Sequence, residues 1–380
     1  MSVLAASVLA VGAAVAAQET PGVAEWPSYR GNPALHGVAE GALPDAPELA
    51  WSFETGGPIL SSPVIANGAV FVGSSDGAIY AVDLATGEKR WSFATDDIVD
   101  APPLVLGDRV YVGSADFFFY ALDAATGELV WKLETQDKIV GSANWFTTPD
   151  GDPRLVFGSY DCFLYCLDPT NGEVVWTYET DNFLNGTPAV LDDRIVFGGC
   201  DTVLHVVSSQ TGEAAAKVPL GADGQVAGSV ALRGDRAYFG HYGNEFVAAD
   251  LSAADVLWRY AESRKGFVSS PAIGTDRAVF GGRDRVLHCV GLADGAPLWT
   301  FKTRRKIDGS PVICGDKVLC GSGDGRIYLL RLEDGSEVWN YELGQSVHST
   351  PAVAGGRFVV GCGDGRLYAF RGPADGQQGG

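Results

Sequence analysis

One motif of about 40 residues recurs through almost the whole chain, and this repeat limits the possible folds more than any other feature. Each copy opens with a glycine, and successive copies start 40 to 45 residues apart. A unit this small cannot bury both of its faces alone, so the copies must stack on one another in a single structure. The eight opening glycines are Gly73, Gly113, Gly158, Gly198, Gly240, Gly281, Gly321 and Gly361.

Each unit predicts four short β-strands. In the first unit these are residues 62–66, 69–73, 78–83 and 88–94, which are rich in β-branched and aromatic residues. The pairs Asn67-Gly68, Asp76-Gly77 and Thr86-Gly87 separate them and are typical of tight hairpin turns. Consecutive hairpins make a four-stranded antiparallel blade, so the sequence predicts an all-β, eight-bladed β-propeller.

A tryptophan closes most units, and we expect these indoles to wedge between neighbouring blades as a structural ladder. In the one unit without tryptophan we assign the position to Lys217. The ladder residues are Trp51, Trp91, Trp131, Trp176, Trp258, Trp299 and Trp339.

The two ends of the repeat predict how the ring closes. The last unit lacks a tryptophan strand, whereas residues 48–55, with Trp51, stand before the first unit without a partner. We therefore expect this N-terminal strand to complete the last blade and leave no open sheet edge. The predicted organisation is a leader at 18–47, the propeller at 48–371 and a flexible tail at 372–380.

Residues 1–17 are small and apolar and end in two small-residue cleavage sites, Ala14-Val-Ala16 and Val15-Ala-Ala17, which is typical of a secretory signal peptide. Its n-region has no Lys or Arg, and its apolar run is too short to predict a membrane span. The expected product is a soluble, monomeric protein of the periplasm or the extracellular space. A formal charge of −20 and the lack of a basic stripe with interleaved aromatics argue against nucleic acid as a partner.

Most residues that could carry chemistry fall at repeated positions, which favours structural roles. One aspartate per unit, such as Asp76, sits in the same turn and is expected to cap its own turn amides. His205 and His288 occupy a position that tyrosine holds in five other units. The seven cysteines share no position in neighbouring units and are interpreted mainly as buried thiols; if one disulfide forms, Cys162 with Cys200 is the favoured pair.

The consensus of the repeat carries a specific resemblance. The segments Ala81-Val-Asp83-Leu-Ala-Thr-Gly87-Glu-Lys-Arg-Trp91 and 121–131 resemble the pyrroloquinoline quinone (PQQ) repeat of eight-bladed quinoprotein propellers, and the match spans about 48–371. The segment 26–32, Trp-Pro-Ser-Tyr-Arg-Gly-Asn, is similar to the leader of bacterial proteins with this repeat. The departures are Lys217, Ala254, Gly291 and Arg331.

This resemblance implies two functional branches. Quinoprotein dehydrogenases hold PQQ on the propeller axis with a calcium ion, an Asp base and commonly a disulfide between adjacent cysteines. A second branch keeps the propeller without the cofactor, as in the outer-membrane barrel-assembly propeller lipoproteins, which serve as docking scaffolds. The chain has no adjacent cysteines and is much shorter than the dehydrogenases, so we expect a non-catalytic scaffold with no cofactor; a PQQ-binding protein or small PQQ dehydrogenase is the alternative.

A candidate site follows from the loops that lead from each tryptophan strand into the next inner strand, because these loops surround the axial mouth of a propeller. Four of their eight axial positions are polar: Asp100, Asn185, Asp308 and His348. Two carboxylates, an amide and an imidazole in one funnel could ligate a cation or a small polar ligand, or they could line a water-filled channel. We assign no catalytic residue and no metal.

The same loops show an uneven distribution of charge. Asp96 and Asp97 begin an acidic arc, and a basic arc follows over the sixth and seventh units at Arg264, Lys265, Arg304, Arg305 and Lys306. A rim with two oppositely charged arcs could steer a protein partner, although an ordinary solvated surface would look the same in the sequence.

Overall fold

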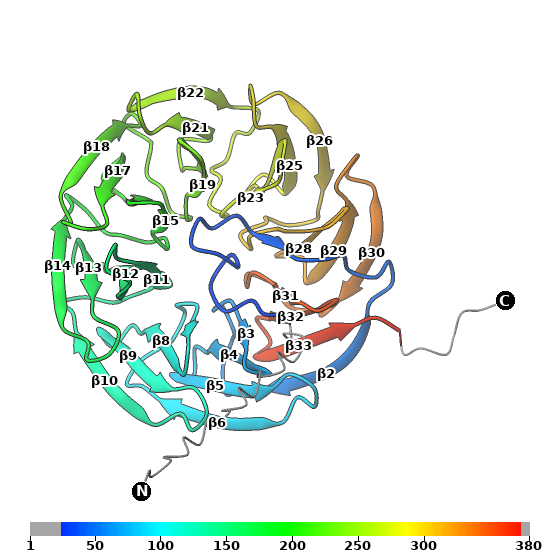
Figure 1. Cartoon of the computed structure of the whole chain (residues 1–380). Coiled ribbons are helices and arrows are strands. Elements are labelled where there is room, and N and C mark those ends of the chain that lie inside the picture. Colours follow the sequence, from blue (N-terminus) through cyan, green and yellow to red (C-terminus); the bar gives the residue numbers. More distant parts are fainter. Residues whose placement is uncertain (1–23, 374–380) are drawn as a thin grey trace, which may run out of the picture.

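Eight antiparallel sheets surround a central axis in the computed structural model, which describes residues 24–373 (Figure 1). The predicted eight-bladed propeller is confirmed. Blade one is β3 to β6, and the numbering continues around the ring to blade seven, β27 to β30. The predicted signal peptide and residues 374–380 of the predicted tail lie outside the described residues.

Blades one to seven run from the axis outward in the order of the chain, as do the first three strands of blade eight. The inner strands are β3 Val64–Ala66, β7 Leu104–Leu106, β11 Asn144–Thr147, β15 Ala189–Leu191, β19 Ala231–Arg233, β23 Ala272–Ile273, β27 Val312–Cys314 and β31 Ala352–Ala354. The second strands are β4 Ala69–Gly73, β8 Arg109–Gly113, β12 Pro153–Gly158, β16 Arg194–Gly198, β20 Arg236–Gly240, β24 Arg277–Gly281, β28 Lys317–Gly321 and β32 Arg357–Gly361.

The third and outer strands complete the blades. The third strands are β5 Ala78–Asp83, β9 Phe118–Asp123, β13 Phe163–Leu167, β17 Val203–Ser208, β21 Phe246–Asp250, β25 Val286–Gly291, β29 Arg326–Arg331 and β33 Arg366–Arg371. The outer strands are β6 Lys89–Ala94, β10 Leu129–Glu134, β14 Val174–Glu179, β18 Ala214–Pro219, β22 Asp255–Tyr260, β26 Pro297–Lys302, β30 Glu337–Glu342 and, in blade eight, β2 Glu48–Glu54.

Blade eight is built from both ends of the propeller. Strand β2 pairs antiparallel with β33, and Trp51 lies opposite Ala369. Figure 1 shows β2 on the perimeter beside the C-terminal β33. The predicted closure is confirmed, and the third strand of the last blade is not left as an unpaired edge.

The opening glycines mark the closest approach between neighbouring blades. A Cβ on Gly73 would lie 2.5 Å from Val99 Cγ1 in the next blade's entry loop, and a Cβ on Gly361 would lie 2.3 Å from Ile59 Cγ2. The other six glycines face an equivalent apolar residue of the next blade. Any larger residue would push the blades apart, so the repeated glycine is a consequence of interblade packing.

The seven ladder tryptophans lie on the outer strands and contact the following blade. The indole N–H of Trp91 donates to the carbonyl of Ala124 at 3.0 Å, and its ring covers Gly127 in the turn of blade two. Where this turn glycine is present it has a positive φ and leaves room for the indole; Gly127, for example, has φ 74°. Trp339 instead packs against Phe370 of blade eight, with ring centroids 5.6 Å apart.

The assignment of Lys217 to the missing tryptophan position is wrong by one residue. In blade three Trp176 lies opposite Cys166, and in blade four the same position of β18 holds Ala216, opposite Val206. Lys217 lies opposite His205. In six other blades this indole contacts a turn glycine of the next blade, whereas blade five carries Ala254 in that turn. Both residues of the contact, the tryptophan and the glycine, are therefore replaced by alanine.

The repeated turn aspartates connect three segments through hydrogen bonds: their own turn, the third strand of the blade and the entry loop. Asp76 Oδ1 accepts the N–H of Ala78, as predicted, while its Oδ2 accepts the Tyr80 hydroxyl at 2.7 Å and the N–H of Gly56 at 2.6 Å. His205 replaces the tyrosine in blade four, with Nε2 2.7 Å from Asp201 Oδ2. The aspartates and these histidines are therefore parts of the blade framework.

The leader, described from residue 24 to 47, follows a path that the repeat does not predict. Its carbonyls accept backbone N–H groups from the inner strands of six blades, beginning at Ile65 and ending at Ile313. Val38–Ala39 forms β1, which adds a parallel fifth strand to blade seven beside β27. In Figure 1 this segment crosses the centre of the ring. The leader thus occupies the axis and ties the blades together.

The remaining sequence features fall where the repeat leaves room for them. The extra residues of blade three form the hairpin between β11 and β12. All seven cysteines are free thiols, so the favoured Cys162–Cys200 disulfide does not form. Within residues 24–373 no helix is long and apolar enough to cross a membrane.

Candidate functional site

The axial cavity lies where the eight blade-entry loops converge. Its volume is about 180 Å³, and its lining includes Tyr29 of the leader. All four polar residues singled out in the sequence line it, together with the four apolar residues at the equivalent positions. The lining positions from these loops are Leu60, Asp100, Val140, Asn185, Ala227, Val268, Asp308 and His348.

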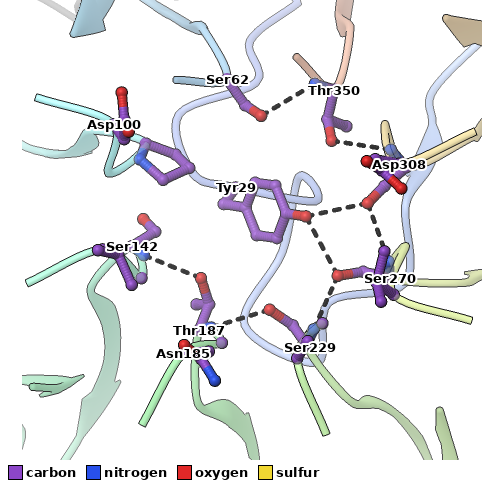
Figure 2. Close-up of a pocket in the computed structure, with 18 of the residues that line it drawn as sticks. Tyr29, Ser62, Asp100, Ser142, Asn185, Thr187, Ser229, Ser270, Asp308 and Thr350 are labelled. Atoms are coloured by element: carbon purple, nitrogen blue, oxygen red, sulfur yellow. Dashed lines mark hydrogen bonds between the residues drawn. The ribbon is translucent and has the colours of Figure 1, made fainter. Parts of the chain in front are cut away.

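A ring of hydroxyl groups lines the cavity (Figure 2). The residue two positions after each axial residue is Ser or Thr in seven blades, and six of these hydroxyls accept the backbone N–H of the preceding blade. Thr187 Oγ1, for example, accepts from Ser142 N at 3.1 Å. Blade two has Pro102 at this position, which supplies no hydroxyl and no N–H, so the ring is open there. The hydroxyls belong to Ser62, Ser142, Thr187, Ser229, Ser270, Ser310 and Thr350.

Tyr29 reaches from the leader into this ring. Its hydroxyl lies 3.1 Å from Ser270 Oγ and 3.1 Å from Ser310 Oγ. Figure 2 shows the Tyr29 hydroxyl directed toward Ser270. The next residue, Arg30, is fully buried and donates from Nη2 to the carbonyl of Pro271 at 2.7 Å. Burial lowers the pKa of this guanidinium to about 10. The leader consequently occupies part of the axis.

Asp308 and His348 form one polar side of the cavity. His348 Nδ1 lies 3.7 Å from Asp308 Oδ2, and the same carboxylate pairs with Arg283 Nε at 3.1 Å and Lys306 Nζ at 2.5 Å. Burial lowers the pKa of His348, so its imidazole is neutral at pH 7. Two cations already neutralise Asp308, and this arrangement does not favour binding a further cation.

Asp100 and Asn185 belong to other blades and have separate partners. Asp100 Oδ1 accepts from Ser75 Oγ at 3.1 Å, and burial raises the pKa of this carboxyl. Asn185 accepts from the Tyr160 hydroxyl and donates to Cys200 Sγ at 3.0 Å. The four predicted residues therefore share one cavity without converging on one point.

The residues present do not fit PQQ with calcium. A cavity of about 180 Å³ that Tyr29 partly fills is small for a fused three-ring cofactor with three carboxylates. Calcium takes six to eight oxygen ligands. Among residues 24–373 no group of three or more His, Cys, Asp or Glu side chains is arranged to hold a metal ion.

A second hollow, which we call the basic hollow, opens beside the axial mouth. It has a volume of about 570 Å³ and shares His348 with the axial cavity. Three residues of the predicted rim line it, and Arg283 and Arg285 join them from the turn between β24 and β25. Arg264, Lys265, Asp96 and Asp97 are exposed on the same set of loops outside the hollow. The rim residues in the lining are Arg304, Arg305 and Lys306.

Large apolar side chains are exposed around the rest of the mouth. We call this set the apolar arc: Leu60, Ile98, Phe117, Phe183 and Tyr242, each at least 38% exposed. The entry loops that hold Ile98 and Phe183 bond directly to the turns between second and third strands, because Ala115 N donates to the carbonyl of Ile98 and Cys200 N to that of Phe183. Reasoning from charge alone missed this arc.

The fold and site define a class: an eight-bladed propeller of the PQQ-repeat type whose axis is occupied by its own N-terminal leader. The family model described as outer membrane protein assembly factor BamB matches residues 42–148, 120–270 and 282–378. Since these matches cover most of the chain, it belongs to this family. No curated protein matches.

Solved structures share the fold at low sequence identity. BamB from Moraxella catarrhalis is 17% identical, with a TM-score of 0.72 over 86% of this chain and 100% of that one. A europium-containing methanol dehydrogenase is 13% identical, with a TM-score of 0.77 over 92% and 98%. Quinohemoprotein alcohol dehydrogenase from Comamonas testosteroni is 14% identical, with a TM-score of 0.77 over 93% and 82%. At these identities the likeness establishes the fold alone.

Proposed function

We propose that the chain is a non-catalytic scaffold of the cell envelope that binds a protein partner on the face around the axial mouth. The observation that carries this proposal is the apolar arc. Large exposed apolar side chains gathered on one face and flanked by charge are typical of protein interaction sites, and aromatic residues are enriched among those that dominate binding energy.

Phe117, one of the exposed residues of the apolar arc, has a strained backbone conformation. It occupies the turn position held by Gly77 in blade one and adopts φ 75°, where a side chain costs about 1–2 kcal/mol. Its ring is 43% exposed, so burial in the isolated chain does not offset this strain. A contact with a partner would supply that burial.

Phe183 provides a rigid neighbouring contact. Its ring stacks on Tyr160 at a centroid distance of 5.0 Å with the planes 8° apart, and Lys138 Nζ lies 4.5 Å from the centroid of the Tyr160 ring. A stacked aromatic side chain loses little conformational freedom on binding, which favours its use as an anchor.

Membership of this family supports a location in the cell envelope and a role without catalysis. The family model's description names an outer membrane assembly factor. We infer that this protein is exported, acts as a monomer in the periplasm or outside the cell, and needs no PQQ. Calorimetric titration with PQQ and calcium should therefore give no saturable heat; one-to-one binding that is lost in Asp308→Asn would contradict the scaffold proposal.

Site-specific photo-crosslinking tests the binding face. A photoreactive phenylalanine analogue replaces Phe117 in the full chain, and irradiation of the cells that express it should give a discrete heavier adduct. The companion change Phe183→Ser should remove most of the adduct, because it deletes the neighbouring anchor.

Leu129 provides the matched control. It lies on the outer strand β10 of the same blade and is 45% exposed, close to the value of Phe117. The same analogue at Leu129 should give no discrete adduct. Equal adducts at both positions, or an adduct that survives Phe183→Ser unchanged, would overturn the assignment of the partner to the axial face.

A further inference from the structure

The basic hollow concentrates positive charge on a molecule whose formal charge is −20. Five of its eight lining residues are Arg or Lys, and none is Asp or Glu. Like charges this close together repel one another, so an isolated chain gains nothing from the cluster. Folding stability therefore does not explain why these cations are clustered.

Three of the five cations have no carboxylate partner. Among residues 24–373 no Asp or Glu oxygen lies within ion-pairing distance of Arg285, Arg304 or Arg305, although Arg283 and Lys306 are paired with Asp308. The nearby Asp324 is already engaged, since it accepts the backbone N–H of Arg304 and the Tyr328 hydroxyl. Three guanidinium groups are thus free to bind an anion, and each can bind a carboxylate through two parallel hydrogen bonds.

Arg285 is held in this cluster against its backbone preference. It takes the turn position where Gly77, Gly325 and Gly365 provide positive φ, and it adopts φ 73°. Glycine would remove the strain at this position. Five of the eight blades place a residue other than glycine at this turn position, so the strain is not particular to Arg285. Its charge is what distinguishes Arg285 from Thr202, which has φ 63° at the same position.

The size and surroundings of the hollow favour a peptide segment as the ligand. Its volume of about 570 Å³ exceeds what one small anion needs and lies within the range of sites for larger ligands. The hollow adjoins the apolar arc, because Arg283 Cζ lies 5.4 Å from the centroid of the Tyr242 ring. The strong overall negative charge would repel a large acidic surface or a second copy of this chain, whereas a short segment senses mainly the local potential within one Debye length.

We propose that the basic hollow binds a carboxylate-rich segment of the partner protein, with Arg285, Arg304 and Arg305 as its principal contacts. This inference rests on the scaffold function proposed above and names the chemistry that the partner must present. The apolar arc provides the anchors, and the hollow selects for Asp and Glu and sets the orientation of the partner.

Fluorescence anisotropy of the full chain tests the proposal. The probe is a labelled hexaglutamate peptide, and hexaglutamine with the same label is the neutral control. We expect saturable binding of hexaglutamate alone, weakening as salt is added. The double change Arg304→Gln, Arg305→Gln should weaken binding about tenfold, which is within the range for two exposed ion pairs. Lys89→Gln, Arg236→Gln removes the same charge from strand ends away from the hollow and should leave binding unchanged.

The substitution Arg285→Gly distinguishes the contribution of the Arg285 charge to binding from its effect on folding stability. It should raise the melting temperature, because glycine tolerates the positive φ, and at the same time weaken hexaglutamate binding. Thr202 occupies the same turn position in blade four with φ 63°, so Thr202→Gly should also raise the melting temperature but leave binding unchanged. Equal binding by wild type and Arg285→Gly would exclude a role for this arginine in the site.

Three outcomes would overturn the inference. The first is equal binding of hexaglutamate and hexaglutamine. The second is binding of inorganic tripolyphosphate without binding of hexaglutamate, which would assign the hollow to phosphate. The third is a dimer in solution that the Arg304, Arg305 variant dissociates, which would assign it to a second copy. If hexaglutamate fails while the Phe117 crosslink persists, only this inference fails and the scaffold proposal stands.

Discussion

At the residue scale, His36 shows how the leader depends on the protonation state of one side chain. Its Nε2 lies 2.7 Å from the carbonyl of Leu232, and its Nδ1 lies 3.3 Å from Asn32 Nδ2. Asn32 Oδ1 already accepts the backbone N–H of His36, so the amide nitrogen faces the imidazole. A neutral ring that donates from Nε2 and accepts at Nδ1 satisfies both contacts. A protonated ring would carry N–H on both nitrogens, so its Nδ1–H would face the amide N–H of Asn32 and two donors would oppose each other.

His36 should therefore contribute to acid sensitivity. Burial is the main cause that lowers its pKa below the ordinary value of 6.5. The unfolded chain then binds this proton more readily, so the free energy of unfolding decreases as pH falls below 6.5. Each unit of difference between the two pKa values is worth about 1.4 kcal/mol. Urea unfolding from pH 7 to 5 should show a smaller loss in His36→Gln than in wild type; parallel curves would exclude this role.

At the element scale, the interface between blades four and five lacks both parts of the ladder contact. Six other interfaces pack an indole on a turn glycine. At the interface between blades three and four, for example, a Cβ on Gly212 would lie 2.6 Å from the Trp176 ring. Here Ala216 faces a turn with Ala254, which adopts φ 52° and packs in the same apolar cluster. The methyl group of Ala254 occupies space that an indole would need, so the two alanines form a matched pair.

The pair predicts strong coupling between two substitutions. Ala216→Trp alone should destabilise the chain by about 1–3 kcal/mol, because the indole would overlap the Ala254 side chain. Ala216→Trp with Ala254→Gly should recover much of this loss, since it recreates the contact of the other blades. A double-mutant cycle from urea unfolding measures the coupling. Additive effects would show that the indole finds another place and that the two positions are independent.

At the scale of the whole molecule, two N-terminal segments hold the ring in different ways. Strand β2 supplies the fourth strand of blade eight, and the leader fills the axis through bonds to the inner strands of six blades. Most residues of the leader from Ser28 to Leu35 are at least partly buried, so its removal would expose both apolar surface and unpaired N–H groups.

Two truncations separate these contributions. A chain that begins at residue 48 should stay monomeric but melt at a lower temperature, because the axis opens. A chain that begins at residue 56 should also oligomerise, because β33 becomes an unpaired edge. A chain that begins at residue 24 is the control and should match the full protein. Size-exclusion chromatography and thermal unfolding measure both effects; a monomeric chain from residue 56 with an unchanged melting temperature would contradict this account.

The periodic pattern of the sequence was sufficient to predict the blades, their number, the closing strand and the eight axial positions. Alternating apolar residues, turn glycines and tryptophans act over distances of one or two strands, and each copy repeats the evidence. The hydroxyl ring was also readable in principle, because Ser or Thr stands two residues after seven of the eight axial positions. The misplaced Lys217 shows the limit, since one residue of register separates an exposed side chain from an interblade contact.

Only the tertiary structure decided what fills the axis and how its charges pair. The leader occurs once, and it binds mainly through its own carbonyls to backbone N–H groups of the inner strands, which leaves no side-chain pattern to read. Arg283 joins Asp308 from a turn 25 residues earlier, and Tyr29 meets Ser270 and Ser310 from more than 240 residues away. Such contacts depend on the closed ring bringing distant segments together, and local sequence cannot specify them without that ring.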